Sequence, residues 1–508
     1  MTSRLTATLV FVASVLVGLT GCSTAGDTSP ATTPRDVSTA VAQCATWYQD
    51  VQSQKFDSLE LINQAEAGQL PLADNTLIVK FHASPRLSVS SLRDEPLSTT
   101  AIRTLAALPD VAYQTLGLNT AHVTTARGSD PWEIARELNN NAAVRYVEPN
   151  LKLMPLSIDY TDDQWAHTSF GMQEAWNAVS TPPGQGVRVA VIDEAFFVSH
   201  EDLAGNLSSD HWDFADDDSD VSTPSASAMS HGTHVAGIIG ALNNDYGVNG
   251  VAPAASLIMA KVFPDDPQQN PATADLISAI QWVSGETVSS SSAPEISERV
   301  DVINISLGVP PPTHSSGQVT SALQSVQEAL GHARANGILT FVATGNYIPG
   351  NEYYNGAPEF MANDGVFAPA NGPCAIAVGS INESGSRSSF SQYSDETYLV
   401  DIMAPGGLSI ESERSADVEE YVLSTDAGEG GTSTYSEQAG TSMASPYVAG
   451  IAAMLMSENP TWTDEQVLTE LLSNTGWAAK FNAYEYGFGV ACPDKIMGAD
   501  TVCGPVPD

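Results

Sequence analysis

The chain has 508 residues, long enough for two or three domains, and its 42% hydrophobic fraction is ordinary for a protein with a packed core. It carries 19 basic residues against 60 acidic ones, a formal net charge of −41. A surface this acidic argues against charge-driven binding to nucleic acid or to an anionic membrane, so nucleic acid is not an expected partner.

The first 22 residues have the features of an export signal. Arg4 supplies a positive start, residues 5–19 are almost all apolar or small, and the segment ends in Leu19-Thr20-Gly21-Cys22. This ending resembles the bacterial lipobox, in which the cysteine is acylated and becomes the new N-terminus. We therefore expect lipidation at Cys22. The alternatives are a plain signal peptide, or a short membrane anchor with an incidental cysteine.

No later run reaches the roughly 18 apolar residues that a membrane-spanning helix needs. We therefore expect an exported protein that is held at the bacterial cell envelope by a lipid anchor rather than threaded through the membrane. Four cysteines remain after the lipidated one, and they are Cys44, Cys374, Cys492 and Cys503. An even number in an exported chain indicates disulfides, with three possible pairings. Cys492 with Cys503 would close a short loop, which leaves Cys44 with Cys374 by elimination.

Residues 23–74 contain a tether rich in Ser, Thr and Pro, followed by a segment of helical pattern. The next stretch predicts a strand at 76–81, a helix at 131–140 and a strand at 144–147. These elements indicate a small α+β domain, which we place at residues 75–154.

Residues 155–508 alternate between apolar strands and helices, which predicts a parallel sheet with helices on both faces. The strands are expected at 189–192, 256–262, 302–305, 338–342 and 375–378, and the helices at 231–242, 273–283 and 320–335. In such a sheet the functional groups gather at the carboxyl ends of the strands.

Ser442 precedes an apolar run at residues 443–456 that has helical spacing and almost no polar face. We expect a buried helix with Pro446 in its first turn. A hydroxyl at this point lies near the positive end of the helix dipole, which suits a nucleophile whose attack creates an oxyanion. The alternative is that Ser442 only caps the helix.

Three further polar residues follow strands or begin a helix. Asp193 ends a strand, where its carboxylate can orient an imidazole. His231 begins a helix after Ser230, and we expect the helix start to lower its pKa, which suits a general base. Asn346 follows another strand, where its amide can donate to an oxyanion. A metal pair of His231 and His234 is the alternative, but it lacks a zinc-binding spacing.

The order of aspartate, histidine and serine is that of the subtilisins. The surrounding motifs are Val-Ala-Val-Ile-Asp193, His231-Gly-Thr-His-Val-Ala-Gly and Gly-Thr-Ser442-Met-Ala-Ser-Pro. From about Asp159 to Ala499 the chain therefore resembles the subtilases, which are subtilisin-like serine proteases. The resemblance implies a subtilisin-like α/β fold and a serine endopeptidase of broad specificity that acts on protein or peptide substrates.

The resemblance also implies a role for each site residue. Ser442 is then the nucleophile, His231 the general acid and base, and Asp193 the carboxylate that orients the imidazole. Asn346 and the backbone N–H of Ser442 form the oxyanion hole. The segment Ser306, Leu307 and Gly308 resembles the edge strand that pairs with an extended substrate.

The loop at residues 241–248 resembles the family's strong calcium site. The implied ligands are the side chains of Asp202 and Asn244 and the carbonyl oxygens of Leu242, Tyr246 and Val248. All five are oxygen donors, as calcium prefers, and the alternative is an ordinary polar loop.

Residues 75–154 look like the inhibitory pro-domain of secreted subtilases, most closely at Val144-Arg-Tyr-Val-Glu-Pro-Asn150. This implies a ferredoxin-like pro-domain that inhibits residues 155–508 within the same chain. It also implies a zymogen that cuts itself between Glu148 and Asp159.

Such a cut would separate the protease from a lipid on Cys22. The protease is then released, held by its pro-domain, or tied by a disulfide between Cys44 and Cys374. We expect a link of the last kind.

Two features depart from the family pattern. Glu194-Ala195 follows the aspartate where Ser or Thr and then Gly are usual, so a second carboxylate favours a protonated His231, and a Cβ at residue 195 is unwelcome if φ is positive. Phe367 lies where the specificity pocket often has a small residue, and we expect it to shorten that pocket.

The departure at Glu194 leaves a second interpretation open, in which a catalytically weak subtilase fold serves as a surface binding or scaffold protein. A serine esterase would need Gly-x-Ser-x-Gly and the order Ser, Asp, His, which this chain lacks.

Overall fold

The structure is a computed structural model of the chain. It describes residues 55–67, 72–82, 97–108, 111–126, 130–151, 154–155, 158–159, 164–222, 230–244, 246–266, 269–309, 323–347, 365–393, 400–408, 421–428, 431–476 and 482–499. Two units are distinguished, Met1–Ala31 and Thr32–Asp508, and all described residues lie in the second. The predicted lipidation at Cys22, together with Cys44 and Cys503, therefore lies outside the described residues. No described helix is long and apolar enough to cross a membrane.

A seven-stranded parallel sheet carries the site. Its strands are β7 (Arg188–Asp193), β8 (Leu207–Asp213), β9 (Ser256–Lys261), β10 (Val302–Ile305), β12 (Leu339–Ala343), β13 (Ile376–Ile381) and β14 (Ile402–Pro405). Their order across the sheet is β14-β13-β12-β10-β7-β9-β8. The five apolar strands expected from the sequence are confirmed. The sheet also has edge strands β8, which is half polar, and β14, which has only four residues, and neither gave a clear sequence signal.

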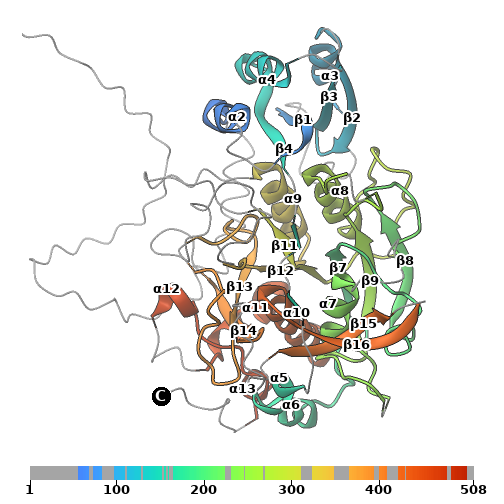
Figure 1. Cartoon of the computed structure of the whole chain (residues 1–508), viewed down its shortest axis with the longest axis vertical. Helices are drawn as coiled ribbons and strands as arrows, with labels where there is room; N and C mark the ends of the chain where they lie inside the picture. The colour runs from blue at the N-terminus through green and yellow to red at the C-terminus, as the bar shows by residue number, and fades with distance from the viewer. Residues whose placement is uncertain are drawn as a thin grey trace, which may run out of the picture. The chain divides into compact units, whose positions relative to one another are not determined.

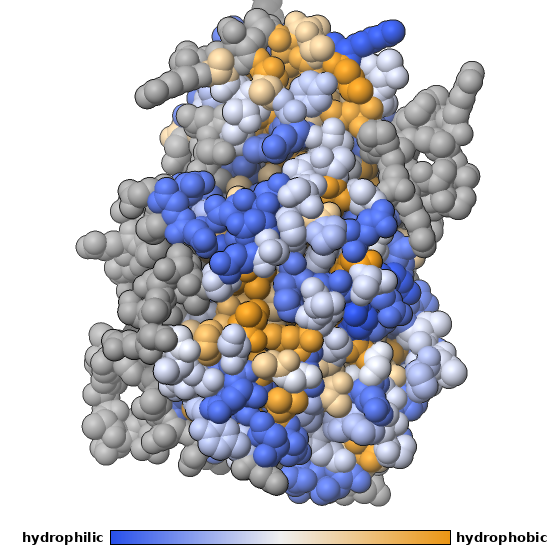
Figure 2. Space-filling model, turned by 90° about the vertical axis from the view of Figure 1, so that its right-hand side faces the viewer, coloured by the Kyte–Doolittle hydropathy of each residue, from blue (hydrophilic) through white to orange (hydrophobic). Residues whose placement is uncertain are grey.

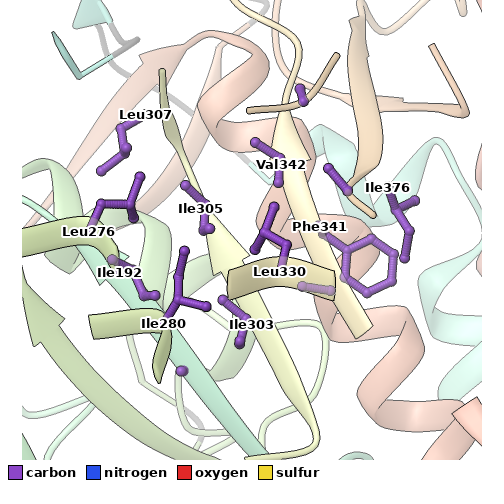
Figure 3. Packing of buried hydrophobic residues seen from close by; sticks show 14 of the residues in the cluster. Ile192, Leu276, Ile280, Ile303, Ile305, Leu307, Leu330, Phe341, Val342 and Ile376 are labelled. Atoms are coloured by element: carbon purple, nitrogen blue, oxygen red, sulfur yellow. The ribbon is translucent and has the colours of Figure 1, made fainter. Parts of the chain in front are cut away.

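Helices cover both faces of this sheet (Figure 1). They include α7 (His231–Gly240), α8 (Thr273–Val283), α9 (Gln324–Ala335) and α10 (Thr441–Glu458). In Figure 3, Ile303 and Ile305 of β10 lie among Ile280 of α8 and Leu330 of α9. Asn304, between them on the strand, points to the other face and bonds to Ser445 of α10. The α/β layering predicted from the alternating pattern is therefore confirmed.

Beyond residue 164, the described residues also form α5 (Trp165–Thr168), α6 (Met172–Ala178), α11 (Asp464–Ser473), α12 (Ala483–Tyr486) and α13 (Pro493–Ile496). On the face in Figure 2, hydrophilic residues predominate and hydrophobic ones form separate groups.

Cys374 and Cys492 each take part in a disulfide bond. The predicted pairings stay predictions, because the other two cysteines are not described.

The described residues 55–151, which we call the N-terminal region, form a four-stranded antiparallel sheet with helices. The elements are α2 (Leu59–Glu66), β1 (Leu72–Phe81), α3 (Thr99–Ala106), β2 (Val111–Gly117), β3 (Thr120–Thr125), α4 (Pro131–Asn140) and β4 (Val144–Leu151). From β1 onward, the succession strand, helix, strand, strand, helix, strand is ferredoxin-like. Asp130 caps α4 and Pro131 occupies its first turn, which explains why this helix could be predicted.

The end of β4 contacts the starts of two helices of the large sheet. Leu151 exchanges two hydrogen bonds of 2.9 Å with the Thr273 hydroxyl at the start of α8. The Glu148 carboxylate accepts from the backbone N–H of Ser325 at 3.1 Å and from its hydroxyl at 2.6 Å, in the first turn of α9. Helix starts have N–H groups without an intrahelical partner, and β4 supplies an acceptor to each helix: Glu148 to Ser325 of α9, and Oδ1 of Asn150 to the N–H of Ala274 in α8, at 3.3 Å.

Two short strand pairs lie near the carboxyl ends of the strands of the large sheet. β5 (Met154–Pro155) pairs with β11 (Leu307–Gly308), which follows β10. β6 (Ile158–Asp159) pairs with the end of β16 (Thr432–Ala439), and β16 forms a hairpin with β15 (Val422–Gly428).

Candidate active site

Asp193 and His231 form a buried pair at the carboxyl end of the sheet. Asp193 is the last residue of β7 and His231 the first of α7, and they are 1% and 3% exposed. The Nδ1 atom of His231 lies 2.6 Å from Oδ1 of Asp193. A carboxylate at this distance holds the imidazole in the tautomer that leaves Nε2 as the basic nitrogen.

Ser442 is the second residue of α10 and is fully buried. Its hydroxyl donates to the carbonyl of Ser306 at 3.3 Å. Nε2 of His231 makes no hydrogen bond to a described residue. Since α7 and α10 contact each other, the three predicted residues share one region.

Pro446 is the sixth residue of α10, so its expected place in the first turn is wrong. A proline there has no N–H to donate to the carbonyl four residues earlier, which belongs to Ser442. The Ser306 hydroxyl donates to that carbonyl instead, at 2.9 Å. The Ser442 carbonyl at the start of α10 is therefore satisfied by Ser306, the residue that follows β10, instead of by the helix itself.

A buried polar network continues from this contact. Ser445 of α10 donates to Oδ1 of Asn304 at 2.7 Å, and Nδ2 of Asn304 is 3.0 Å from the Ser306 hydroxyl. Asn304 and Ser445 were not singled out from the sequence. A buried asparagine within an otherwise apolar strand was the signal that could have found the network.

Asn346 lies three residues beyond β12, close to the start of α10. Its Oδ1 accepts from the backbone N–H of Thr441 at 3.0 Å and from the Thr441 hydroxyl at 2.9 Å. These two bonds fix the orientation of the amide and turn its NH₂ end away from Thr441. A side-chain amide held in this way beside the nucleophile can stabilise an oxyanion.

The pKa of His231 is raised, contrary to the lowering expected at a helix start. Burial alone would lower this pKa, but the charge and hydrogen bond of Asp193 and the charges of Glu194 and Asp426 raise it. The effect of the helix start is outweighed because three carboxylates face the imidazole. The expectation that Glu194 favours protonated His231 agrees with this direction.

Glu194 also caps α7. Its Oε1 accepts from the backbone N–H of His231 at 2.8 Å, and Asp426 of β15 accepts from the N–H of Ser230 at 2.8 Å. Ala195 is not among the described residues with positive φ, so the strain considered for its Cβ is absent. The residues Glu194 and Ala195 therefore fit at this position without backbone strain.

No local sequence pattern marks Asp426, which only the fold brings to α7.

Replacement of Glu194 by glutamine should move the acidic limb of the pH–rate profile to lower pH. The glutamine keeps an oxygen for the His231 N–H but lacks the negative charge that raises the His231 pKa. Because the base must be neutral, activity would then persist to more acidic pH. The measurement is kcat/KM between about pH 4 and 9, a range that spans the titration of a histidine. Glu201→Gln, at an exposed glutamate, should leave the limb in place, and an unmoved limb in Glu194→Gln would contradict the charge effect.

The predicted calcium ligands Asp202 and Asn244 lie side by side. The fully buried Asp202 carboxylate accepts from Nδ2 of Asn244 at 2.9 Å, from the backbone N–H of Val248 at 3.0 Å and from the Tyr435 hydroxyl at 2.9 Å. Oδ1 of Asn244 accepts from the N–H of Tyr246. A buried carboxylate next to an amide fits calcium, provided that the amide turns over to direct its oxygen at the ion.

Two other groups with possible metal ligands are explained without an ion. Nε2 of His234 lies 3.0 Å from the carbonyl of Ser436, and burial lowers its pKa to about 3. In the described part of the chain, one cluster of three carboxylates was found, and it consists of Asp213, Asp216 and Asp265. The ammonium of Lys261 forms ion pairs with all three, so a built-in cation already offsets part of their charge.

Comparison with known proteins agrees with this geometry. A sequence model of the Subtilase family (Peptidase_S8) matches residues 184–490. Subtilisin NAT from Bacillus subtilis subsp. natto is 37% identical over 379 residues, 73% of this chain and 79% of that protein. An extracellular protease from Xanthomonas campestris pv. campestris is 28% identical over 468 residues, 83% of this chain and 73% of that protein.

Solved structures share the fold. A protease from Pseudoalteromonas arctica has a TM-score of 0.53 and 29% identity, covering 66% of this chain and 96% of that one. The epidermin leader peptide processing serine protease from Staphylococcus aureus has a TM-score of 0.58 over 83% of this chain and 97% of that one, and at 20% identity this likeness concerns the fold alone. With a family match over residues 184–490 and a curated relative at 37% identity, the chain belongs to the subtilase family of serine proteases.

Proposed function

We propose that the protein is a serine endopeptidase in which Ser442, His231 and Asp193 form the catalytic triad. The observation that carries this proposal is the buried Asp193–His231 pair, 2.6 Å apart, beside a helix whose second residue is the fully buried Ser442. Protein and peptide chains are the proposed substrates.

In the proposed reaction, Oγ of Ser442 attacks the carbonyl carbon of the scissile bond while Nε2 of His231 takes the hydroxyl proton. Asn346 and the backbone N–H of Ser442 donate to the oxyanion. The C–N bond then breaks, and His231 gives the proton to the leaving amine. Water repeats the sequence on the acyl-enzyme and restores Ser442. Asp193 keeps its negative charge throughout and stabilises the imidazolium.

A fluorophosphonate probe tests the nucleophile directly. It should add to Ser442 in the wild type, inhibit peptide hydrolysis, and leave the other serines unlabelled on peptide mapping. Only an activated serine reacts at a useful rate, because the probe also needs the base. A properly folded protein that neither takes the probe nor cuts casein would overturn the proposal in favour of a binding or scaffold role.

The N-terminal region is proposed to act as an inhibitory pro-domain. In addition to Glu148, it contributes Arg145 and Lys80, whose charged groups lie 2.7 Å and 3.3 Å from the carboxylate of Glu328 on α9. All three side chains are at most 8% exposed. Removing one partner of a buried ion pair typically costs about 3–5 kcal/mol because the other charge stays buried and unpaired, so this contact requires the acid of α9 to be present.

Self-cleavage is proposed to follow from the course of the chain after β4. β5 pairs with β11 just beyond Ser306, and β6 pairs with the end of β16, two residues before Thr441. A substrate strand held on both sides of Ser442 would use these two partners. We therefore propose that the protein cuts its own chain between Pro155 and Ile158, within the wider range expected from the sequence.

Calcium is proposed to bind Asp202, Asn244 and the carbonyl oxygens of Leu242, Tyr246 and Val248. The ion would hold the loop against Asp202 and stabilise the fold, because it binds only the folded state. Millimolar calcium should raise the thermal midpoint by several degrees, and chelation should reverse the shift. Asp202→Asn should abolish the response, whereas Asp216→Asn, in the acidic cluster around Lys261, should keep it. A response that survives Asp202→Asn would contradict this site.

Acylation of Cys22 and anchoring at the bacterial cell envelope remain a proposal. If a disulfide between Cys44 and Cys374 ties the cut chain together, the mature protease stays in the membrane fraction until a reductant is added. Complete release without reductant would contradict that pairing.

A further inference from the structure

Residues 55–67, which we call the α2 segment, precede the ferredoxin-like part of the N-terminal region and pack on it. The helix α2 lies against α4 and β4 (Figure 1). Its Ile62 and Ala65 are buried and belong to the same hydrophobic core as Leu138 of α4. The α2 segment is therefore a folded part of the N-terminal region, although the sequence places the domain only from residue 75.

The α2 segment also covers the outer edge of β4. This strand is the last of its sheet and pairs with β1 alone, so the backbone groups of its other edge have no strand partner. The N–H of Phe56 donates to the carbonyl of Arg145 at 2.9 Å, and the buried Ser58 hydroxyl accepts from the N–H of Val147 at 3.0 Å. The α2 segment thus supplies partners to the strand that contacts both α8 and α9.

The Phe56 ring positions the guanidinium of Arg145. The guanidinium carbon lies 5.5 Å from the centroid of this ring and 5.5 Å from that of Tyr146, and the two rings meet edge to face at 6.0 Å. The same guanidinium forms the buried 2.7 Å ion pair with Glu328 of α9. Since an aromatic ring attracts a guanidinium and limits its orientations, Phe56 favours the orientation that meets this acid.

A second set of hydrogen bonds fixes the α2 segment to the end of α4. The backbone N–H of Ser58 donates to Oδ1 of Asn139 at 3.1 Å, and Nδ2 of Asn139 donates to the Asp57 carboxylate at 2.8 Å. The backbone between Phe56 and Ser58 is therefore held by α4 as well as by β4, so it cannot move without breaking both sets of bonds.

We propose that the α2 segment is a working part of the inhibitor, which holds β4 where Arg145 and Glu148 contact α9 and so keeps the N-terminal piece bound after self-cleavage. The inference rests on the proposed protease and pro-domain functions and adds how inhibition is maintained. Loss of these contacts leaves backbone groups of β4 without partners and the guanidinium without one of its two rings. The cut piece then leaves the protease sooner.

Phe56→Ala in the full chain tests the inference. Because Phe56 precedes the proposed cut, the wild type and the variant release a protease of identical sequence. Equal amounts of cut complex, quantified by intact mass, are diluted, and peptide hydrolysis is followed over time. We expect the activity of the variant to appear at least about tenfold sooner, since a cation–π contact and an aromatic pair together contribute about this factor. The final rates should be equal.

Leu59→Ala is the matched control, because Leu59 lies in the same helix but is 43% exposed. Its activity should appear at the wild-type time. Phe56→Leu keeps an apolar side chain without the ring and should also be faster than the wild type. It takes the place of Phe56→Ala if that variant yields no cut complex.

Amide hydrogen exchange in the uncut Ser442→Ala chain gives a readout that needs neither cleavage nor activity. Adding Phe56→Ala should accelerate exchange in β4 and at the N–H of Ser325, which donates to Glu148, relative to exchange in β10. Adding Leu59→Ala should leave this ratio unchanged. If neither Phe56 variant yields cut complex, the ratio alone decides, and an unchanged ratio overturns the inference.

The remaining outcomes separate this inference from the proposed function. A wild type that cuts itself and takes the fluorophosphonate, with release equally slow in the Phe56 variants, overturns the inference and leaves the proposed function intact. Faster exchange without faster release also overturns it, because the α2 segment then only stabilises β4. A wild type that neither cuts itself nor takes the probe overturns both.

Discussion

Replacement of Ser442 by alanine should lower kcat by about 10⁶-fold, the loss measured for the equivalent change in subtilisin. The variant loses the atom that attacks the carbonyl, while the Ser306 hydroxyl still donates to the backbone carbonyl of residue 442, so the fold should persist. Intact mass is the second readout. We expect the wild type to shorten by a cut between Pro155 and Ile158 and the variant to remain uncut.

Ser457→Ala serves as the control for this change. Ser457 lies near the other end of α10, where its hydroxyl donates to the Met454 carbonyl and accepts from the Gly184 N–H. This variant should be processed and active. Hydrolysis that survives Ser442→Ala at a comparable rate would refute the assignment of the nucleophile.

Replacement of Asp193 by asparagine should lower kcat by about 10⁴-fold, as the same change does in another serine protease. The amide keeps the size of the carboxylate but removes the charge that stabilises the imidazolium, and it favours the wrong tautomer of His231. Since Asp193 raises the pKa of His231, the residual activity should also extend to lower pH.

Asp301→Asn tests whether any partly buried aspartate would give this loss. Asp301 precedes β10, at the opposite end of the strands from the site, and accepts from the backbone N–H of Arg188 at 2.9 Å. Its variant should retain normal kcat. If Asp193→Asn loses less than about tenfold, the buried pair is structural rather than catalytic.

The parts of the fold that could be predicted are those with a strong local period. The strands β7, β9, β10 and β12 and the helix α8 were apolar and bounded by turn residues, so their bounds agree within one residue, whereas β13 ends three residues later than predicted. The β15–β16 hairpin escaped notice because its strands are rich in Ser and Thr. Its partners are distant in the chain: Thr425, for example, bonds to the carbonyl of Thr233.

The candidate site likewise combines residues that local motifs mark with residues that only the fold brings together. Asp193, His231 and Ser442 stand in recognisable local motifs, but one of the carboxylates that raise the His231 pKa, Asp426, lies far along the chain. Likewise, the effect of Pro446 depends on Ser306, since a proline inside a helix is tolerated only where another donor reaches the released carbonyl. Local sequence carries no information on such partners.

The buried contacts of Glu328 bear on which proteases the N-terminal region, as the proposed inhibitor, can bind. Lys80 and Arg145 both end at this carboxylate, with little access to water. A related protease with an apolar residue at that position would leave two cations desolvated and unpaired, at a cost of several kcal/mol. The N-terminal region, added as a separate polypeptide, should therefore discriminate between proteases by one acidic side chain on α9, and cross-inhibition should follow the presence of that acid.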